Sequence, residues 1–123
     1  MIGKTATVST IVNETNTAKA VGSGSLDVFA TPMMTALMER AACQCLAFDT
    51  GQTSVGTAIS VEHTAASPLG AEVSATATIT AVDGRKIEFE VTANDRKGEI
   101  GHGTHTRVIT DIERFMTKAK TRI

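Results

Sequence analysis

The chain has 123 residues, of which 41% are hydrophobic, and a formal net charge of -1 at pH 7. This length predicts a single domain, residues 1–123, with one core. The near-neutral charge argues against general binding to nucleic acid or to acidic membrane surfaces. No apolar stretch is long enough to span a bilayer, and the start contains no signal-peptide core. We therefore expect a cytoplasmic protein that partners neither nucleic acid nor membrane.

Cysteine and histidine spacing predicts no disulfide and no metal site. Cys43 and Cys45 are two residues apart in a segment expected to be helical, where such side chains do not face each other. We interpret them as reduced thiols, which agrees with a cytoplasmic location. His102 and His105 are three apart on a predicted strand, so they point to opposite faces. No third ligand is spaced to join them.

The N-terminal region predicts one strand and then irregular chain. Residues 4–12 alternate, with Ala6 and Val8 separated by Thr and Ser, as in a half-buried strand. Residues 13–20 are polar and poorly periodic, which predicts a loop. Residues 21–26 contain two glycines and look irregular, and a short extended piece follows.

A long helix is predicted from Pro32 to about Phe48. Proline suits the first helical position, and the hydroxyl of Thr31 is placed to cap the helix. The segment is rich in good helix formers, and Gly51 follows its end. Most apolar side chains share one arc at about 100° per residue, namely Met34, Leu37, Met38, Ala41, Ala42, Cys45 and Phe48. The helix is nearly apolar all round, so we expect a large cover such as a wrapped sheet.

Glu39 interrupts this apolar helix. On the helical wheel Arg40 and Gln44 lie together on the polar side, whereas Glu39 falls at the edge of the apolar arc, between Leu46 and Cys43. A carboxylate in that position is partly removed from water unless a polar group meets it.

Four long strands are predicted after the helix, over residues 55–66, 71–82, 87–93 and 99–112. Ser67-Pro68-Leu69-Gly70 forms a turn, Asp83-Gly84 is a strong hairpin signal, and the fourth strand contains two glycines that favour a bulge. The tail after Glu113 is basic and is either a short helix or loose. A four-stranded antiparallel meander with one apolar face needs a cover, and the helix is the available one. We predict an α+β hotdog fold, an antiparallel sheet wrapped around one long central helix.

Three polar residues are candidates for chemistry. His63 alternates with Ile59 and Val61 and is expected to face the helix. Thr31 lies at the helix start and Glu39 two turns later. Taken singly, His63 is equally consistent with a satisfied core histidine, whereas Thr31 is better explained as a plain N-cap and Glu39 as a solvated carboxylate. Together they offer a base or nucleophile, a proton carrier and a donor at a positive helix end.

Three segments resemble the fluoroacetyl-CoA thioesterase family and its broader hotdog thioesterase relatives. They are Val28-Phe29-Ala30-Thr31-Pro32 with Leu37-Met38-Glu39, the run Val61-Glu62-His63-Thr64-Ala65-Ala66-Ser67-Pro68-Leu69-Gly70, and the run Ile100-Gly101-His102-Gly103-Thr104-His105-Thr106-Arg107. The resemblance covers about residues 22–115, in the same order and with compatible spacing.

The resemblance implies hydrolysis of an acyl-CoA thioester to a free acid and CoA. Thr31, Glu39 and His63 would be the catalytic set, with Glu39 as nucleophile or as base for water and His63 as proton carrier. Phe29, the Gly70 backbone and Arg107 would bind substrate, although Arg107 alone reads equally well as a surface ion-pair former. No cofactor is expected, since CoA enters only as part of the substrate.

The resemblance also implies a homodimer with the site at its interface, and exposed strand edges favour such pairing, possibly extended to a dimer of dimers. One segment departs from the family pattern. Residues 22–27 are small and polar where the fluoroacetyl-specific enzyme has aromatic lid residues, which predicts a different acyl group. A non-catalytic acyl-CoA binding module and, less favoured, a hotdog enoyl-CoA hydratase are the alternatives.

Overall fold

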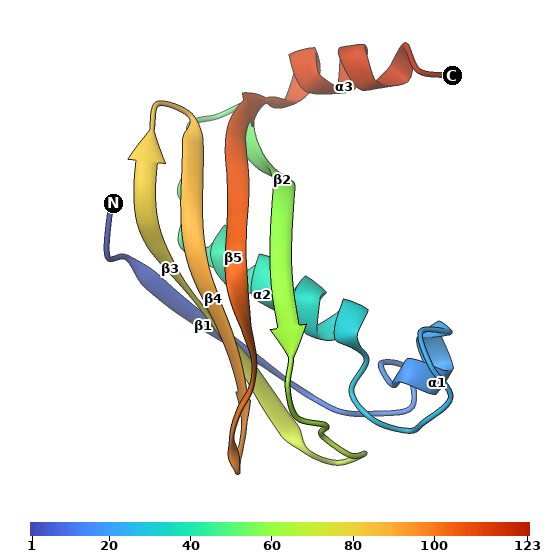
Figure 1. Cartoon of the computed structure of the whole chain (residues 1–123). Helices are drawn as coiled ribbons and strands as arrows, with labels where there is room; N and C mark the ends of the chain where they lie inside the picture. The colour runs from blue at the N-terminus through green and yellow to red at the C-terminus, as the bar shows by residue number, and fades with distance from the viewer.

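A curved five-stranded antiparallel sheet wraps one side of helix α2 (Thr31–Gln44) in the computed structural model, which describes residues 1–123 (Figure 1). This arrangement confirms the predicted α+β sheet around a central helix. None of the helices is long and apolar enough to cross a bilayer. The remaining elements are β1 (Thr5–Ile11), α1 (Ala18–Val21), β2 (Gln52–His63), β3 (Glu72–Asp83), β4 (Lys86–Asp95), β5 (Gly98–Asp111) and α3 (Ile112–Lys120).

The strand order is β1-β3-β4-β5-β2, so the predicted four-strand meander is wrong at one connection. β3, β4 and β5 pair in sequence, but β2 pairs with β5 at the far edge of the sheet instead of with β3. The turn around Pro68 therefore belongs to a crossing loop, which the Val28 bridge to Pro68 and the 2.8 Å bond from Phe29 N–H to Ser67 O hold down. This crossing leaves β2 with one unpaired edge.

Helix α2 begins differently from the prediction. Ala30, not Thr31, occupies the N-cap position, and its carbonyl accepts from the amides of Met33 and Met34 at 3.0 and 2.9 Å. Thr31 is the first helical residue, and no side chain caps the helix. The Thr31 hydroxyl is therefore free to bond elsewhere.

The same helix ends earlier than predicted. It stops at Gln44, because the Cys45 amide closes on the Ala42 carbonyl at 3.0 Å in a tighter turn. Phe48 consequently lies outside the buried arc and is 37% exposed. Cys45, by contrast, remains buried, as the wheel predicts. Both cysteines are free thiols.

The core lies between α2 and the concave face of the sheet, with the alternating residues of β3 and β4 supplying one wall. Its main members are Phe29, Met34, Leu37, Met38, Val73, Ile79, Ile87, Phe89 and Val91. The helix packs mainly against β1 and β3 and only lightly against β2. The space beside β2 therefore stays open to polar side chains.

Two glycines in β5 are required by close packing. A Cβ at Gly101 would lie 2.6 Å from the Met34 sulfur, and one at Gly103 would overlap the Ser60 carbonyl. The predicted bulge in this strand does occur, but at Ile100, where the pairing with β4 passes from Gly101 to Glu99.

A second bulge lies in β2. Its register with β5 skips Thr57, so the pairs on either side are Gly56 with Arg107 and Ala58 with Thr106. The prediction put Val55 and His63 on one face by strict alternation. The extra residue breaks that alternation, and Ser54 and Gly56 turn toward the interior instead.

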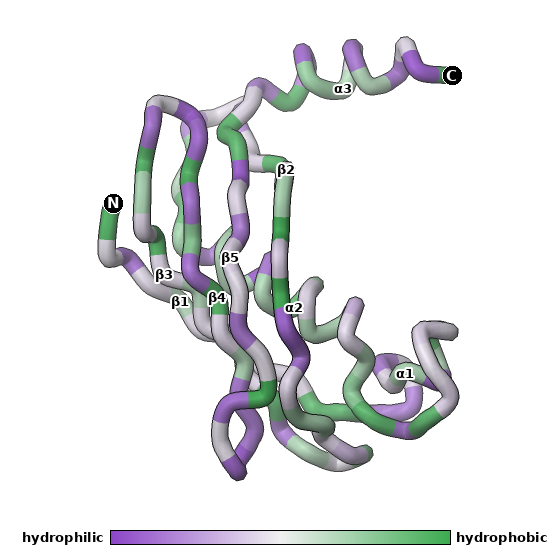
Figure 2. The backbone as a smooth tube through the Cα atoms, viewed as in Figure 1, coloured by the Kyte–Doolittle hydropathy of each residue, from purple (hydrophilic) through white to green (hydrophobic).

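The ends of the chain add two helices. Residues 18–21 form α1, a single turn capped by Thr17, where the sequence pattern suggested a loop. The basic tail is helical, as one of its two predicted forms. In α3 the apolar Ile112, Phe115 and Met116 are 40% exposed or more. Figure 2 shows the hydrophobic parts of α3 on the side toward β2 and its hydrophilic parts on the opposite side.

Candidate functional site

The first polar pair joins the start of α2 to the end of β2. Thr31 Oγ1 and His63 Nδ1 are 2.7 Å apart. Because the bulge shifts the alternation in β2 by one residue, His63 points toward the helix. Thr31 lies in the exposed first turn of α2. The predicted inward orientation of His63 and its proximity to Thr31 are confirmed.

One ring nitrogen of His63 has no hydrogen-bond partner. This nitrogen, Nε2, is buried. Burial lowers the pKa of His63 below the ordinary 6.5, and the Ala65 backbone offsets part of this effect. The imidazole is therefore neutral at pH 7, which leaves it able to accept or donate a proton.

A cleft of about 260 Å³ opens over this pair. Phe29 and Ser23 contribute to its walls, together with Ala65 and Ala66 from the crossing loop. Phe29 itself is only 1% exposed, so it supports the cleft mostly from the core side.

Glu39 stands apart from that pair within one chain. It follows Thr31 by eight residues on the same helix, which corresponds to about 12 Å along the axis. Its Oε2 lies 3.8 Å from Arg107 Nη1, and its side chain is 41% exposed. The predicted position at the margin of the buried arc is confirmed, and the polar group that meets the carboxylate is an arginine.

Arg107 is buried, with an exposure of 7%, so the reading as a surface ion-pair former is wrong. Its guanidinium donates from Nε to Ser54 Oγ at 2.8 Å and from Nη2 to the Ser54 carbonyl at 3.1 Å. Nη1 lies 3.2 Å from His105 Nε2. A buried cation needs such partners, and here they leave Nη1 directed toward Glu39.

His105 completes this second cluster. It is 2% exposed, its Nδ1 is 2.8 Å from the Ala58 carbonyl, and its ring stacks on Phe89 with centroids 5.8 Å apart. Burial lowers the pKa of His105 most, and the Arg107 charge lowers it further, against opposing effects of Ala58 and Glu39. His102, on the opposite face, is 47% exposed at its side chain and contacts Glu62 and Glu99.

Gly56 lets this cluster pack closely against the backbone of β2. A Cβ built there would lie 3.0 Å from Glu39 Oε2, 3.2 Å from His105 Cε1 and 3.3 Å from Arg107 Nη1. The missing side chain therefore permits a close approach of a carboxylate, an imidazole and a guanidinium to this strand.

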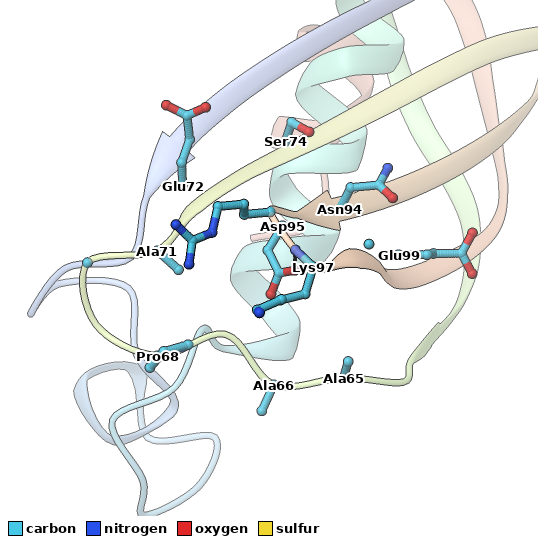
Figure 3. Close-up of a pocket in the computed structure, with 13 residues that line it drawn as sticks. Ala65, Ala66, Pro68, Ala71, Glu72, Ser74, Asn94, Asp95, Lys97 and Glu99 are labelled. Carbon is cyan, nitrogen blue, oxygen red and sulfur yellow. Dashed lines mark hydrogen bonds between the residues drawn. The ribbon is translucent and has the colours of Figure 1, made fainter.

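A larger groove, about 1000 Å³, adjoins the cleft and shares Ala65 and Ala66 with it. Lys97, in the turn after β4, projects over this groove opposite Pro68 (Figure 3). Gly70 also lines it with a φ of +90°, but the Gly70 N–H already donates to the Val12 carbonyl at 2.8 Å. Only its carbonyl is left to contact a ligand.

Sequence reasoning thus located one polar pair and missed part of the other cluster. Thr31 and His63 are brought together, whereas Glu39 joins Arg107, with Gly56 and Ser54 as the partners not foreseen. The bulge at Thr57 carries no sequence signal that alternation could reveal. No group of three or more His, Cys, Asp or Glu side chains is arranged to hold a metal ion.

Comparisons with known proteins identify the family of this chain. The family model for the fluoroacetyl-CoA-specific thioesterases matches residues 12–113. The fluoroacetyl-CoA thioesterase of Streptantibioticus cattleyicolor is 44% identical over 96 residues, which cover 76% of this chain and 69% of that protein.

Solved structures are similar over almost the whole chain. A point mutant of the fluoroacetyl-CoA-specific thioesterase FlK has a TM-score of 0.93 at 35% identity, over 100% of this chain and 97% of its own. A thioesterase superfamily member from Thermus thermophilus has a TM-score of 0.89 at 25% identity, over 99% and 94%. A hot-dog-like protein from Thermanaerovibrio acidaminovorans, at 22% identity, shares the fold with a TM-score of 0.90. The hotdog prediction and the predicted resemblance are both confirmed, and the chain belongs to the fluoroacetyl-CoA-specific thioesterase family.

Proposed function

We propose that this protein hydrolyses an acyl-CoA thioester, with Thr31, His63 and Glu39 as its catalytic residues. The observation that carries the proposal is the neutral His63 bonded to Thr31 at the open start of α2, with a buried ring nitrogen left unpaired. A non-catalytic binding module has no need of such a proton carrier. Family membership supports the same reaction class.

In the proposed reaction, water is the second substrate. Glu39 supplies the attacking oxygen, either its own carboxylate oxygen or that of a water it deprotonates. A C–O bond forms at the thioester carbonyl, the C–S bond breaks, and CoA leaves as a thiol after proton transfer. Where the Glu39 carboxylate itself attacks, the acyl group is left on Glu39 as an anhydride, which water then hydrolyses to release the acid and regenerate the carboxylate. Thr31 and His63 stabilise the oxyanion and move the proton, aided by the positive end of α2.

This set becomes complete in a homodimer. Within one chain Glu39 is about two helical turns from Thr31, too far to act on the same carbonyl. We infer that two copies pair through the free edge of β2, with antiparallel helices that carry Glu39 of the partner subunit toward Thr31 and His63. The exposed apolar face of α3, on the side toward β2, would be covered by the same pairing.

The acyl group is proposed to differ from fluoroacetyl. The segment next to the cleft, residues 22–27, carries small and polar side chains except for the exposed Leu26, and Ser23 is its contribution to the cleft wall. Such a border leaves the entrance wide. A mutant of FlK has been solved in complex with acetyl-CoA, and short acyl-CoAs are therefore the first substrates to try.

The test is CoA release from a panel of short, branched and aryl acyl-CoAs, measured with wild type, Glu39→Gln and Arg40→Gln. Arg40 is the matched control, because it is the next residue on the helix but is exposed and has no ion pair. We expect turnover of at least one substrate, a loss of about 10²-fold or more in kcat for Glu39→Gln, and no change for Arg40→Gln.

Binding without CoA release by the wild type would overturn the proposal in favour of a binding module. Single-turnover hydrolysis in H₂¹⁸O separates the two roles of Glu39, because only the nucleophilic route passes the label through the Glu39 carboxylate. Analytical ultracentrifugation tests the dimer, and a monomeric active protein would refute the shared site.

A further inference from the structure

One buried ionisable side chain has no part in the proposed chemistry. His105 packs against Gly56, on the same face of β5 as Arg107, and is 2% exposed. It lines neither the cleft over Thr31 and His63 nor the adjoining groove. A buried polar ring of this kind is costly unless it is fully hydrogen-bonded, and both of its nitrogens have partners.

These partners fix one protonation state. The Ala58 carbonyl, 2.8 Å from Nδ1, can only accept, so Nδ1 carries the proton. Arg107 Nη1, 3.2 Å from Nε2, can only donate, so Nε2 presents its lone pair. Stacking on Phe89 holds the ring plane. The imidazole is thus a neutral link between a β2 carbonyl and the guanidinium.

The contact from His105 matters because the nitrogens of the Arg107 guanidinium have different partners. Nε and Nη2 donate hydrogen bonds to Ser54. Nη1 is the nitrogen that faces Glu39, at 3.8 Å, and it also packs closely against Gly56. His105 is the partner that anchors Nη1 on the protein side. Without this acceptor, the guanidinium is free to tilt away from the carboxylate.

We propose that His105 is a positioning residue for the thioesterase site, acting as a neutral acceptor that keeps Arg107 Nη1 aimed at Glu39. The role rests on the proposed function, because it orients the group that orients Glu39. It requires an acceptor facing Arg107 and a donor facing Ala58, and it does not require an imidazole as such. Glutamine offers both groups on one side chain, whereas phenylalanine keeps the ring and offers neither.

The experiment compares His105→Gln, His105→Phe and the control His102→Gln on the homodimer as isolated. His102 lies three residues away on the outer face of the same strand. We expect kcat to fall about tenfold or more in His105→Phe with KM little changed, since small misplacements of catalytic groups cost this much. His105→Gln should stay within about threefold of wild type, as should His102→Gln.

A second readout does not depend on activity. In ¹⁵N NMR spectra at pH 7.5, wild type should give His105 signals of a neutral ring protonated at Nδ1. The Arg107 side-chain resonances should be retained in His105→Gln and broadened in His105→Phe. Equal kcat in all three variants, a doubly protonated ring, or an unchanged Arg107 in His105→Phe would each overturn the proposal. A wild type without thioesterase activity refutes the proposed function alone, and the Arg107 resonances still decide the link.

Discussion

The two histidines that face the helix, His63 and His105, differ in how completely they are bonded. Both are held neutral by burial, which lowers the pKa of each. His105 has a partner at each ring nitrogen, lies under the sheet–helix interface and is 2% exposed. His63 is bonded only through Nδ1 and borders a cleft.

This difference separates chemistry from support. A ring with an unpaired nitrogen beside a cleft is free to exchange a proton with a substrate, whereas a fully bonded ring can only hold its neighbours in place. In the proposed function, His63 serves proton transfer, whereas His105 holds Arg107 in position. Each variant below changes one side of this contrast.

The largest effect is expected from replacing His63, the histidine with an unpaired ring nitrogen. His63→Ala takes away the proton carrier and leaves Thr31 without its partner at 2.7 Å. We expect kcat for acyl-CoA hydrolysis to fall about 10²–10⁴-fold, the usual contribution of a general acid–base group. Glu62→Gln, at the adjacent residue whose side chain is 75% exposed and faces His102, is the matched control. A His63→Ala variant with wild-type kcat and a normal Tm would reduce His63 to a structural residue.

A smaller effect is expected from Gly56→Ala, which changes the cluster around Arg107 and His105. The new Cβ would press on Glu39 Oε2 at 3.0 Å and on Arg107 Nη1 at 3.3 Å, so both must move by a few tenths of an ångström. We expect kcat/KM to fall about tenfold. The free energy of unfolding should not fall, because alanine is favoured over glycine within a strand by about 0.5–1 kcal/mol.

Thermal unfolding of Gly56→Ala is therefore its own control. A loss of activity together with a large drop in Tm would mean that the cluster had been disrupted and not merely displaced. Unchanged kcat/KM would mean that the positions of Glu39 and Arg107 within the cluster do not limit the reaction.

The contrast also marks what could be predicted from the sequence. Period-two patterns in β3 and β4 and the apolar arc of α2 identified the sheet, the helix and the inward face of His63, because each depends on local repetition. The family segments led to the prediction of Thr31, Glu39 and Arg107 as site residues, and their roles stay a prediction. The helix, the sheet and the pairing of Thr31 with His63 thus follow from sequence pattern.

The cluster of Glu39, Arg107 and His105 depends on contacts between residues far apart in the sequence. The place of β2 beside β5 is decided by packing at the sheet edge, and the bulge at Thr57 reverses the face of Ser54 and Gly56. His105 belongs to a predicted strand, but nothing in a single sequence says that Arg107 and Ala58 occupy its two nitrogens. Burial of Arg107 has the same origin, since its acceptors come from a strand about fifty residues away.

The smallest expected effect concerns stability against pH. The pKa values of His63 and His105 are lowered in the folded protein, whereas in the unfolded chain they are near 6.5. As pH falls below about 6.5, the unfolded chain takes up protons that the folded one does not, so the free energy of unfolding decreases. This contribution is complete above about pH 7. Between pH 7.5 and pH 5.0 we expect Tm to fall by about 2–5 °C.

The acid side of this window isolates the histidines from the one carboxyl group with a clear shift. Hydrogen bonds from Ser67 and the Lys97 amide lower the pKa of Asp95 below 3.8, so its contribution is lost only as pH falls below about 4. His105→Gln should flatten the Tm profile between pH 7.5 and 5.0, because the fully buried ring has no route to accept a proton without breaking its bond to Arg107. If His105→Gln follows the wild-type profile while His63→Ala is flat, His63 alone is coupled to folding, and the two rings differ in protonation as well as in bonding.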